Sequence, residues 1–364
     1  MALVPKNVKE LDPYKAGLSI EEVRRRFGLA RIIKLASNEN PLGPSPRAVA
    51  AAAICLAECH RYPDPASRDL RAALAARFDV KIENVITGSG SEGIMSAIMR
   101  TFLLHDDEIV SSANTFVGFK VLASASGRKM HWVPMNNRRY DLERMAGALN
   151  EYTKIIYIAN PDNPTGSYVT VDEFEKFMAC VPARALVLLD EAYFEFATGC
   201  ANYPDSMGYR FDNVITLRTF SKAHGLAGLR VGYGFAHSDL IANLLKVKLP
   251  FEPSTPAQAA ALAAIEDNDH LTRTIELTRT GRDFIIAQLR ALGLETLPSA
   301  ANFVAFVVPG DGRADQLCEA LLRRGIIIRP LRAFGWPDMA RVSIGLPQEN
   351  EAFVEELRAV LPTI

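Results

Sequence analysis

The stretch TLRTFSKAHGLAGLRVGY (residues 216–233) places a single lysine, Lys222, among small and polar residues, and Arg230 follows eight positions later. A lysine amine can serve as a covalent catalyst because it condenses with an aldehyde to an imine, provided that it is partly desolvated and held in place. A lysine considered alone is usually a solvated surface charge. Its interpretation therefore depends on the residues that accompany it.

Two polar residues follow apolar segments that are typical of strands. Asp190 ends such a segment in ALVLLDEAY (185–193), and Tyr193 lies three residues further on. Ligands of open α/β sheets bind beyond the carboxyl ends of strands, where an aspartate can keep a pyridine ring protonated as an electron acceptor. Asp190 could equally cap the next segment. Asn163, in IANPDNPTGSYV (158–169), is presented from a turn that two prolines and a glycine make rigid.

A candidate anion site lies in ITGSGSEGIM (86–95), which reads as a strand, a Gly/Ser turn and the start of a helix. Free N–H groups at a helix start, aided by the helix dipole, suit a phosphate. The glycine spacing matches neither the dinucleotide fingerprint nor the P-loop. Thr219 and Ser221 could add hydroxyl donors to the same anion, whereas Ser91 and Glu92 could simply cap the helix.

Two further side chains, those of Phe116 and Arg341, indicate a function only in combination with the residues above. Phe116, in NTFVGF, follows a predicted strand and could stack on a flat ring. Arg341, in ARVSIG, carries a planar guanidinium that suits a carboxylate or a phosphate. The ordinary alternatives are core packing for Phe116 and a strand-end salt bridge for Arg341.

The elements that must position these residues alternate between apolar strands and amphipathic helices. Continuous apolar runs indicate strands covered on both faces, and the i, i+3, i+4 pattern of residues 91–102 predicts a helix. This alternation predicts an α/β fold with a mostly parallel sheet between helices. The predicted strands cover 83–88, 107–112, 129–134, 154–160, 185–193 and 213–218.

The pattern of expected helices and strands changes after the proline-rich segment FEPSTPAQ (251–258). Beyond it we expect a long helical region to residue 290, strands at 301–308, 326–331 and 340–346, and a closing helix from residue 349. We therefore predict a large domain over 41–255. Residues 1–40 and 256–364 would form an N-terminal arm and a smaller C-terminal α/β domain.

Composition narrows the function classes. The chain has 364 residues, of which 49% are hydrophobic and 23% charged, with a formal net charge of −1. This balance is typical of a soluble globular protein and predicts neither nucleic-acid nor membrane binding. The longest apolar run, 48–57, predicts a buried alanine-rich helix. Five cysteines without a CxxC pair predict no metal site and a reducing, cytoplasmic location.

In this order the motifs resemble the histidinol-phosphate aminotransferases, which are pyridoxal 5′-phosphate (PLP) enzymes of the aspartate-aminotransferase fold. The resemblance spans nearly the whole chain. It implies fold type I, with a mostly parallel mixed sheet in the large domain. The segments that carry it are SNENPLGPSP, RYPD, GSGSEGI, NPDNPTG, LLDEAY, RTFSKAHGLAGLRVGY, ANFV, IIIRPL and RVSIG.

The resemblance also implies a role for each matching position. Lys222 would hold PLP covalently and shuttle protons, and Asp190 would pair with the ring nitrogen. Asn163 and Tyr193 would donate to the ring hydroxyl oxygen, and Phe116 would stack on the ring. The other implied residues are those at the cofactor phosphate, namely Ser91, Glu92, Thr219, Ser221, Arg230 and Tyr62 of the neighbouring subunit, and those at the substrate, namely Arg341, Asn40, Tyr14 and Arg329.

The resemblance favours amino transfer between L-histidinol phosphate and 2-oxoglutarate in histidine biosynthesis. The alternatives are the same chemistry on aromatic amino acids, decarboxylation of threonine phosphate, or a PLP-binding module without turnover. Arg332, Phe334 and Trp336 lie where substrate preference could be set, and Asp162 stands where the family commonly has asparagine. A homodimer is expected, because Tyr62 is useful only if it reaches a partner's site.

Overall fold

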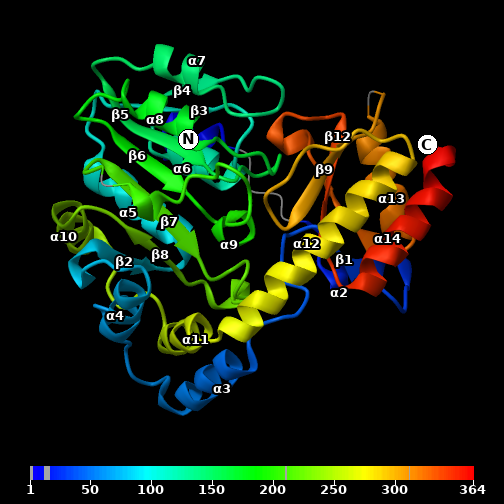
Figure 1. Ribbon diagram of the computed structural model, residues 1–364, viewed down its shortest axis with the longest axis horizontal. Helices are drawn as coiled ribbons and strands as arrows, with labels where there is room; N and C mark the ends of the chain where they lie inside the picture. Colours follow the sequence, from blue (N-terminus) through cyan, green and yellow to red (C-terminus); the bar gives the residue numbers. More distant parts are fainter. Residues whose placement is uncertain (1–2, 12–16, 210, 311) are drawn as a thin grey trace.

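The computed structural model describes residues 3–11, 17–209, 211–310 and 312–364. Its main element is a seven-stranded sheet in the order β2-β8-β7-β6-β5-β3-β4 (Figure 1). Only β8 runs antiparallel to its neighbours, as expected for a mostly parallel mixed sheet. The strands are β2 (Val85–Gly88), β3 (Glu108–Ser112), β4 (Lys129–Val133), β5 (Thr153–Ala159), β6 (Leu186–Asp190), β7 (Val214–Thr219) and β8 (Gly232–Phe235).

Helices cover both faces of this sheet, which explains its continuous apolar strands. Alternate residues of β5 belong to different cores: Ile155 and Tyr157 to one, Ile156 and Ile158 to the other. This is the two-residue period of a strand. The covering helices are α5 (Gly90–Phe102), α6 (Val117–Ala125) and α10 (Ser238–Val247) on the first face, and α7 (Leu142–Gly147) and α8 (Val171–Met178) on the second.

Strand β8 was not among the predicted strands, because its sequence GYGF is rich in glycine, which β-strands disfavour. The structure supplies the reason for the glycines. A Cβ at Gly232 would lie 2.5 Å from the backbone nitrogen of Ser91, and a Cβ at Gly234 would lie 2.7 Å from the carbonyl oxygen of Thr216. Close backbone packing therefore selects glycine here against local strand propensity.

A third group of helices packs at the β2–β8 side of the sheet, comprising α3 (Pro46–Cys55), α4 (Arg68–Arg77) and α11 (Thr255–Ile265). The alanine-rich helix predicted near residue 48 is present as α3, but the prediction that it is buried is wrong for the single chain. Ala48 is buried on α11, whereas Ile54 is 76% exposed. The domain boundary at residues 255 and 256 stays a prediction, and α11, just beyond it, packs on the large-sheet side.

The C-terminal part forms a smaller layer. Its three-stranded antiparallel sheet has the order β11-β12-β9, and β1 pairs with β10 in a separate parallel pair. The predicted strand 326–331 is therefore two strands with different partners. The elements are β1 (Ile33–Lys34), β9 (Phe303–Val307), β10 (Ile326–Ile327), β11 (Arg329–Pro330), β12 (Met339–Ser343), α12 (Asn268–Ala291), α13 (Arg313–Arg323) and α14 (Pro347–Val360).

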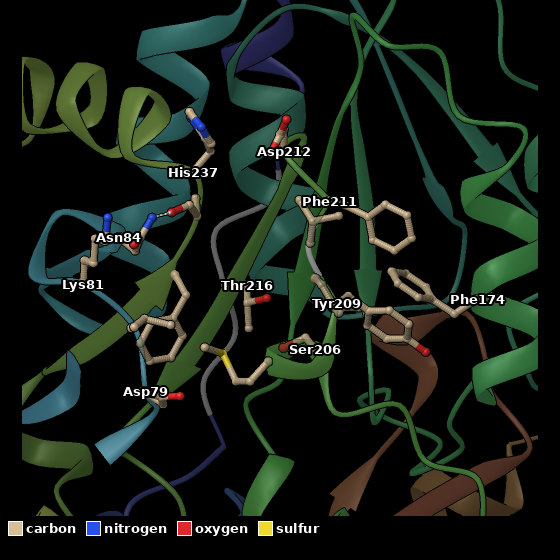
Figure 2. A pocket seen from close by; sticks show the side chains of 16 residues that line it. Asp79, Lys81, Asn84, Phe174, Ser206, Tyr209, Phe211, Asp212, Thr216 and His237 are labelled. Carbon is tan, nitrogen blue, oxygen red and sulfur yellow. Dashed lines mark hydrogen bonds between the residues drawn. The ribbon is translucent and has the colours of Figure 1, made fainter. Parts of the chain in front are cut away.

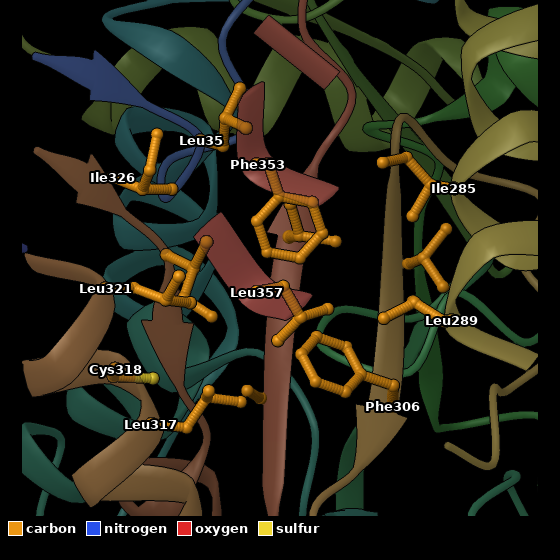
Figure 3. Close-up of a cluster of buried hydrophobic side chains, with 14 of the residues drawn as sticks. Leu35, Ile285, Leu289, Phe306, Leu317, Cys318, Leu321, Ile326, Phe353 and Leu357 are labelled. Carbon is orange, nitrogen blue, oxygen red and sulfur yellow. The ribbon is translucent and has the colours of Figure 1, made fainter. Parts of the chain in front are cut away.

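A separate hydrophobic core holds this layer together (Figure 3). Phe353 and Leu357 of α14 meet Phe306 of β9 and Ile285 of α12, all fully buried. The N-terminal segment joins the same core through Leu35. Short helices α1 (Lys6–Lys9), α2 (Ile20–Phe27) and α9 (Phe194–Ala197) complete the α-helices of the described residues. None of the described helices is both long and apolar enough to cross a bilayer.

Candidate active site

One cavity at the carboxyl ends of the parallel strands collects most of the predicted side chains. They come from loops that follow β2, β3, β5, β6 and β7, far apart in sequence. The cavity is lined by Ser91, Glu92, Phe116, Ala159, Pro161, Asn163, Asp190, Ala192, Tyr193, Thr219, Ser221, Lys222 and Arg230. Eleven residues are expected to bind PLP, and the ten that come from the same chain as the cavity all line it.

 The eleventh, Tyr62, is the residue assigned to the neighbouring subunit.

Lys222 lies in the loop after β7, with its side chain half-buried beside the cavity. Its Nζ donates a hydrogen bond to the carbonyl oxygen of Ser37 at 3.3 Å and lies 5.8 Å from the centre of the Tyr193 ring. Burial, together with the positive charge of Arg341, lowers the pKa of the Lys222 amine to about 8. A larger share of this amine is therefore neutral and nucleophilic near pH 7 than in an exposed lysine.

Asp190 ends β6 and is almost completely buried. Its Oδ2 accepts a hydrogen bond from the Tyr157 hydroxyl at 2.7 Å, and its Oδ1 accepts one from the backbone N–H of Ala192 at 3.2 Å. Burial raises the pKa of the Asp190 carboxyl to about 6, although both hydrogen bonds oppose the shift. A nearby cationic group would return this carboxyl to its charged form.

The predicted anion site lies at the start of α5. Ser89, the N-cap residue, makes no capping hydrogen bond with its side chain, and Gly90 has a left-handed φ of 72°. A Cβ at Gly90 would lie 2.8 Å from Arg230 Nη2, so only glycine lets the guanidinium approach this helix start. Arg230 also contacts Ser221 Oγ at 3.5 Å and Glu92 Oε2 at 3.4 Å. Backbone N–H groups, hydroxyls and a guanidinium therefore converge here, as a phosphate requires.

The turn that carries Asn163 is anchored by its neighbour Asp162. This fully buried carboxylate accepts hydrogen bonds from the hydroxyls of Thr115, at 2.7 Å, and Thr165, at 2.8 Å. Burial raises the pKa of Asp162 to about 6. Because Thr115 directly precedes Phe116, the same carboxylate links the loop of the predicted stacking ring to the turn of Asn163. This explains how an aspartate is accommodated in NPDN.

Three consecutive residues of the N-terminal segment, 36–38, also belong to the site; Ser37 and Asn38 begin the motif SNENPLGPSP, but none of the three was assigned a role from the sequence. Asn38 Nδ2 donates to the Tyr193 hydroxyl oxygen at 2.9 Å, which leaves the Tyr193 hydroxyl hydrogen available for a ligand. Ser37 accepts from Lys222, and the carbonyl oxygen of Ala36 accepts from Arg341 at 2.9 Å. Asn38 has a left-handed φ of 56°, which asparagine tolerates better than most residues. That preference was the one signal in the sequence.

Arg341 reaches the site from β12 of the smaller layer. It is buried, and besides Ala36 it contacts Asn163 Oδ1 through Nη1. Because the guanidinium holds the amide oxygen of Asn163, the amide N–H groups of Asn163 are directed elsewhere. Arg341 of the smaller layer therefore lies beside the cavity, where it contacts Asn163 in the loop after β5 of the large sheet.

Three of the remaining predicted positions, Asn40, Arg329 and Tyr62, lie outside the lining of this cavity. Asn40 donates to the carbonyl oxygen of Ala223 at 2.9 Å, which ties the N-terminal segment to the lysine loop. Arg329 is half-buried on β11. Tyr62 is 80% exposed and stacks on Phe251. Tyr14 lies outside the described residues. The substrate roles of Asn40, Arg329 and Tyr14 therefore stay predictions.

The segment expected to influence substrate choice also packs away from the cavity lining. Phe334 is buried in a cluster with Leu297 and Leu331, and Trp336 packs on the same cluster. The Arg332 side chain lies at the surface, where it pairs with Asp315 at 2.6 Å. These residues support the wall of the site through Val117, next to Phe116, rather than forming it.

A separate cavity of about 300 Å³ shares no lining residue with the lysine cavity. Figure 2 shows that aromatic side chains, including Phe174, Tyr209 and Phe211, line one side of it. Asp79, Lys81 and other polar residues line the opposite side. None of the predicted catalytic residues is among the residues that line this second cavity.

A half-buried lysine, a buried carboxylate and an anion-binding helix start at the carboxyl edge of a mixed α/β sheet define a PLP-dependent enzyme of the aspartate-aminotransferase fold. The family model for aminotransferases of class I and II matches residues 30–357. The chain belongs to this family. The predicted fold class, enzyme class and cofactor are thereby confirmed.

Similar proteins narrow the family further. The chain is 43% identical to the histidinol-phosphate aminotransferase of Anaeromyxobacter sp., covering 99% of this chain and 100% of that one. It is 41% identical to histidinol-phosphate aminotransferase 1 of Nitrosococcus oceani, over 99% and 97%. The crystal structure of histidinol-phosphate aminotransferase from Sinorhizobium meliloti, in complex with pyridoxal-5′-phosphate, has a TM-score of 0.90 at 30% identity, covering 100% and 98%. The resemblance found in the motifs is therefore confirmed.

Proposed function

We propose that this chain transfers the amino group between L-histidinol phosphate and 2-oxoglutarate, with PLP as cofactor, in histidine biosynthesis. The observation that carries the proposal is the meeting of Lys222 and Asp190 in one cavity with Arg341 beside it. The names of the similar proteins support the choice of substrate.

The residues of the cavity fit PLP group by group. The start of α5, with Ser221, Thr219 and Arg230, would hold the phosphate. Asp190 would lie at the ring nitrogen. The glycines at 90 and 232 support this fit, because a Cβ at either position would fill space at the helix start. When bound, the cofactor supplies an electron sink for charge that develops at the α-carbon of the donor.

Lys222 would act twice. Its amine would first hold the cofactor aldehyde covalently, and the lowered pKa of about 8 keeps part of that amine neutral for the attack. Once an amino donor has displaced it, Lys222 Nζ would take the proton from the donor's α-carbon and return it as general base and acid. The Ser37 carbonyl oxygen, which accepts from Nζ, would hold the amine in the cavity between these events.

Asn163 and Tyr193 would donate hydrogen bonds to the ring hydroxyl oxygen. Each has its own acceptor atom engaged by another donor, Arg341 for Asn163 and Asn38 for Tyr193. Their remaining hydrogens are therefore directed toward other acceptors. Phe116 would pack on the ring face as an apolar counterpart of the more usual tyrosine.

One guanidinium would serve both substrates. Arg341 is a planar fork that binds a carboxylate or a phosphate through two hydrogen bonds. It would grip the α-carboxylate of glutamate in one half-reaction and the phosphate of histidinol phosphate in the other. Its position beside Asn163 places this anion contact next to the cofactor ring.

We also propose that the enzyme is a homodimer with shared active sites. The exposed apolar residues Val49, Ile54 and Leu56, on and after α3, support this, as does the 80% exposure of Tyr62. Burying such side chains against a second copy would remove apolar area from water. Mixing inactive Lys222→Ala and Tyr62→Ala chains should restore activity in heterodimers, which contain one intact site. Absence of recovery in dissociated and reassociated mixtures would contradict shared sites.

The proposal also covers the cellular location of the enzyme and its division into domains. We place the enzyme in the cytoplasm, and its five unpaired cysteines fit a reducing compartment. We also propose the division of the chain into a large domain over 41–255 and an arm with a small domain over 1–40 and 256–364. The separate hydrophobic core of the C-terminal layer supports this division.

The substrate assignment is tested with a panel of amino donors. Histidinol phosphate, phenylalanine, tyrosine and threonine phosphate are each incubated with the purified enzyme, PLP and 2-oxoglutarate, and glutamate is measured. We expect the highest kcat/KM with histidinol phosphate. Faster turnover of phenylalanine or tyrosine would assign an aromatic aminotransferase. Release of carbon dioxide from threonine phosphate without glutamate would assign a decarboxylase.

A further inference from the structure

A buried tyrosine lies directly behind the carboxylate of Asp190. Tyr157, in the middle of β5, is fully buried, and its hydroxyl donates to Asp190 Oδ2 at 2.7 Å. The backbone N–H of Ala192 donates to the other carboxylate oxygen at 3.2 Å. Two donors from different segments therefore fix the plane of the carboxylate. Asp190 also lines the cavity, and each of its oxygens retains a lone pair for a further donor.

The sheet and a neighbouring helix fix Tyr157 in turn. Tyr157 pairs with Leu188 in the parallel register of β5 and β6, so Asp190 lies two residues further along the same face. The ring stacks on Phe119 of α6, with centroids 3.8 Å apart and planes 7° apart. A hydroxyl in such an apolar core is costly unless it is hydrogen-bonded. Its position is therefore determined by packing, and its hydrogen bond by Asp190.

We propose that Tyr157 is a positioning residue that keeps Asp190 oriented and ionised under the pyridine nitrogen of the cofactor. The proposal rests on the role proposed above for Asp190. The Tyr157 hydroxyl donates only to the carboxylate form with full effect, since a protonated carboxyl oxygen is a weaker acceptor. Losing this donor would leave Asp190 buried with less stabilisation of its charge.

The groups that face Asp190 act in opposite directions. Burial raises its pKa, and Glu92 of α5 raises it further. The hydroxyl of Tyr157, the N–H of Ala192 and the charge of Lys222 lower it. Among these, Tyr157 is the largest opposing influence, so its removal shifts the balance most toward the neutral acid. A neutral carboxyl cannot keep the pyridine nitrogen protonated by charge.

The test uses Tyr157→Phe, which keeps the ring and its stack on Phe119 and removes only the hydroxyl. Tyr233→Phe is the matched control: Tyr233 is also buried, on β8, and does not hydrogen-bond to Asp190.

 The dissociation constant of PLP is measured by titrating each apoprotein through its fluorescence. We expect PLP to bind about 10-fold more weakly to Tyr157→Phe, because one hydrogen bond to a charged group is lost. The affinity of Tyr233→Phe for PLP should be unchanged.

A second measurement reports the ring nitrogen itself. The variants are reconstituted with PLP labelled with nitrogen-15 in the ring, and the nitrogen resonance gives the fraction that is protonated. Tyr157→Phe should lower this fraction and move its pH midpoint downward, because a less ionised Asp190 holds the proton less well. Wild-type protonation and affinity in Tyr157→Phe would overturn the proposal, as would equal changes in Tyr233→Phe.

Asp190→Asn separates this proposal from the role of Asp190. If Asp190→Asn leaves ring protonation and PLP affinity unchanged, the assignment of Asp190 itself fails. If Asp190→Asn lowers both and Tyr157→Phe lowers neither, only the role of Tyr157 fails. In the double variant Tyr157→Phe should add less than twofold to the effect of Asp190→Asn, because the hydroxyl acts through that carboxylate. Independent, multiplicative effects would also overturn the proposal.

Discussion

Replacing Asp190 with asparagine should have opposite effects on the stability of the apoprotein and on PLP binding. The buried carboxylate is proposed to bind the cofactor ring, but its burial lowers the free energy of unfolding of the apoprotein. The carboxyl is 4% exposed, and burial raises its pKa from 3.8 to about 6 against the hydrogen bonds of Tyr157 and Ala192. Between these two pH values the folded apoprotein binds more protons than the unfolded chain. Its stability therefore falls as the pH rises through this window and stays lowered above it.

The size of this effect follows from the shift. A difference of 2.2 units (6 − 3.8) corresponds to about 3 kcal/mol at pH 8. At about pH 4.5 only about 1 kcal/mol of the penalty has developed. Asparagine carries no charge but has one carboxyl-type oxygen instead of two, so it loses one hydrogen bond, worth about 1 kcal/mol. Asp190→Asn should therefore stabilise the apoprotein by about 2 kcal/mol at pH 8 and by about nothing at pH 4.5.

Urea unfolding of the two apoproteins at both pH values measures the difference. Asp106→Asn, at an exposed position, is the control for removing an acidic residue, and it should show no such dependence on pH. A destabilised Asp190→Asn at pH 8, or a change of equal size at both pH values, would refute the argument from burial. The same substitution should nevertheless weaken PLP binding in the holoenzyme, since the ring nitrogen loses its anionic partner.

Three other substitutions test the site and its support. Lys222→Ala should bind PLP without covalent attachment, so borohydride should no longer fix the cofactor to the chain; fixation in this variant would contradict the assignment. Arg341→Lys should raise KM at least about 10-fold for both substrates, because the bidentate fork is lost, and an unchanged KM would count against its role. Gly225→Ala should destabilise the protein by about 2 kcal/mol or more, because φ is +70° and the new Cβ would lie 2.4 Å from the carbonyl oxygen of Gly43. Gly228→Ala, with nothing within 4 Å, is its control in thermal unfolding.

The predicted cofactor residues shared a local signal. Asp190 is the last residue of a strand, and Asn163 and Lys222 lie within four residues after the ends of β5 and β7. A parallel sheet brings such positions to one edge whatever their distance along the chain. Sequence reasoning needed only the strands and their direction to group them. It did not need the register or the fold of the intervening loops.

Other residues had no such signal, for identifiable reasons. Tyr157 reads as one more apolar residue of a buried strand, and only the register of β5 against β6 aligns its hydroxyl with Asp190. Strand β8 was not predicted because close backbone packing requires glycine at positions 232 and 234, and glycine has a low strand propensity. Phe334 and Trp336 were assigned to substrate choice from their composition, whereas tertiary contacts pack them against the loop of Phe116. In each case a long-range contact decides the outcome.

The segment of residues 36–38 shows why a motif can be recognised while the roles of its residues stay unpredicted. Its successive residues contact Arg341, Lys222 and Tyr193, which come from β12, from the loop after β7 and from the loop after β6. Two of these contacts are made by backbone carbonyl oxygens, which every residue type possesses. These carbonyl oxygens matter only because of where they lie, and the pairing of β1 with β10 just before the segment determines their location. A short strand that contributes no side chain to the cavity lining therefore fixes three functional groups relative to one another. Substitutions that disturb β1 should accordingly impair the site without touching any residue that binds a ligand.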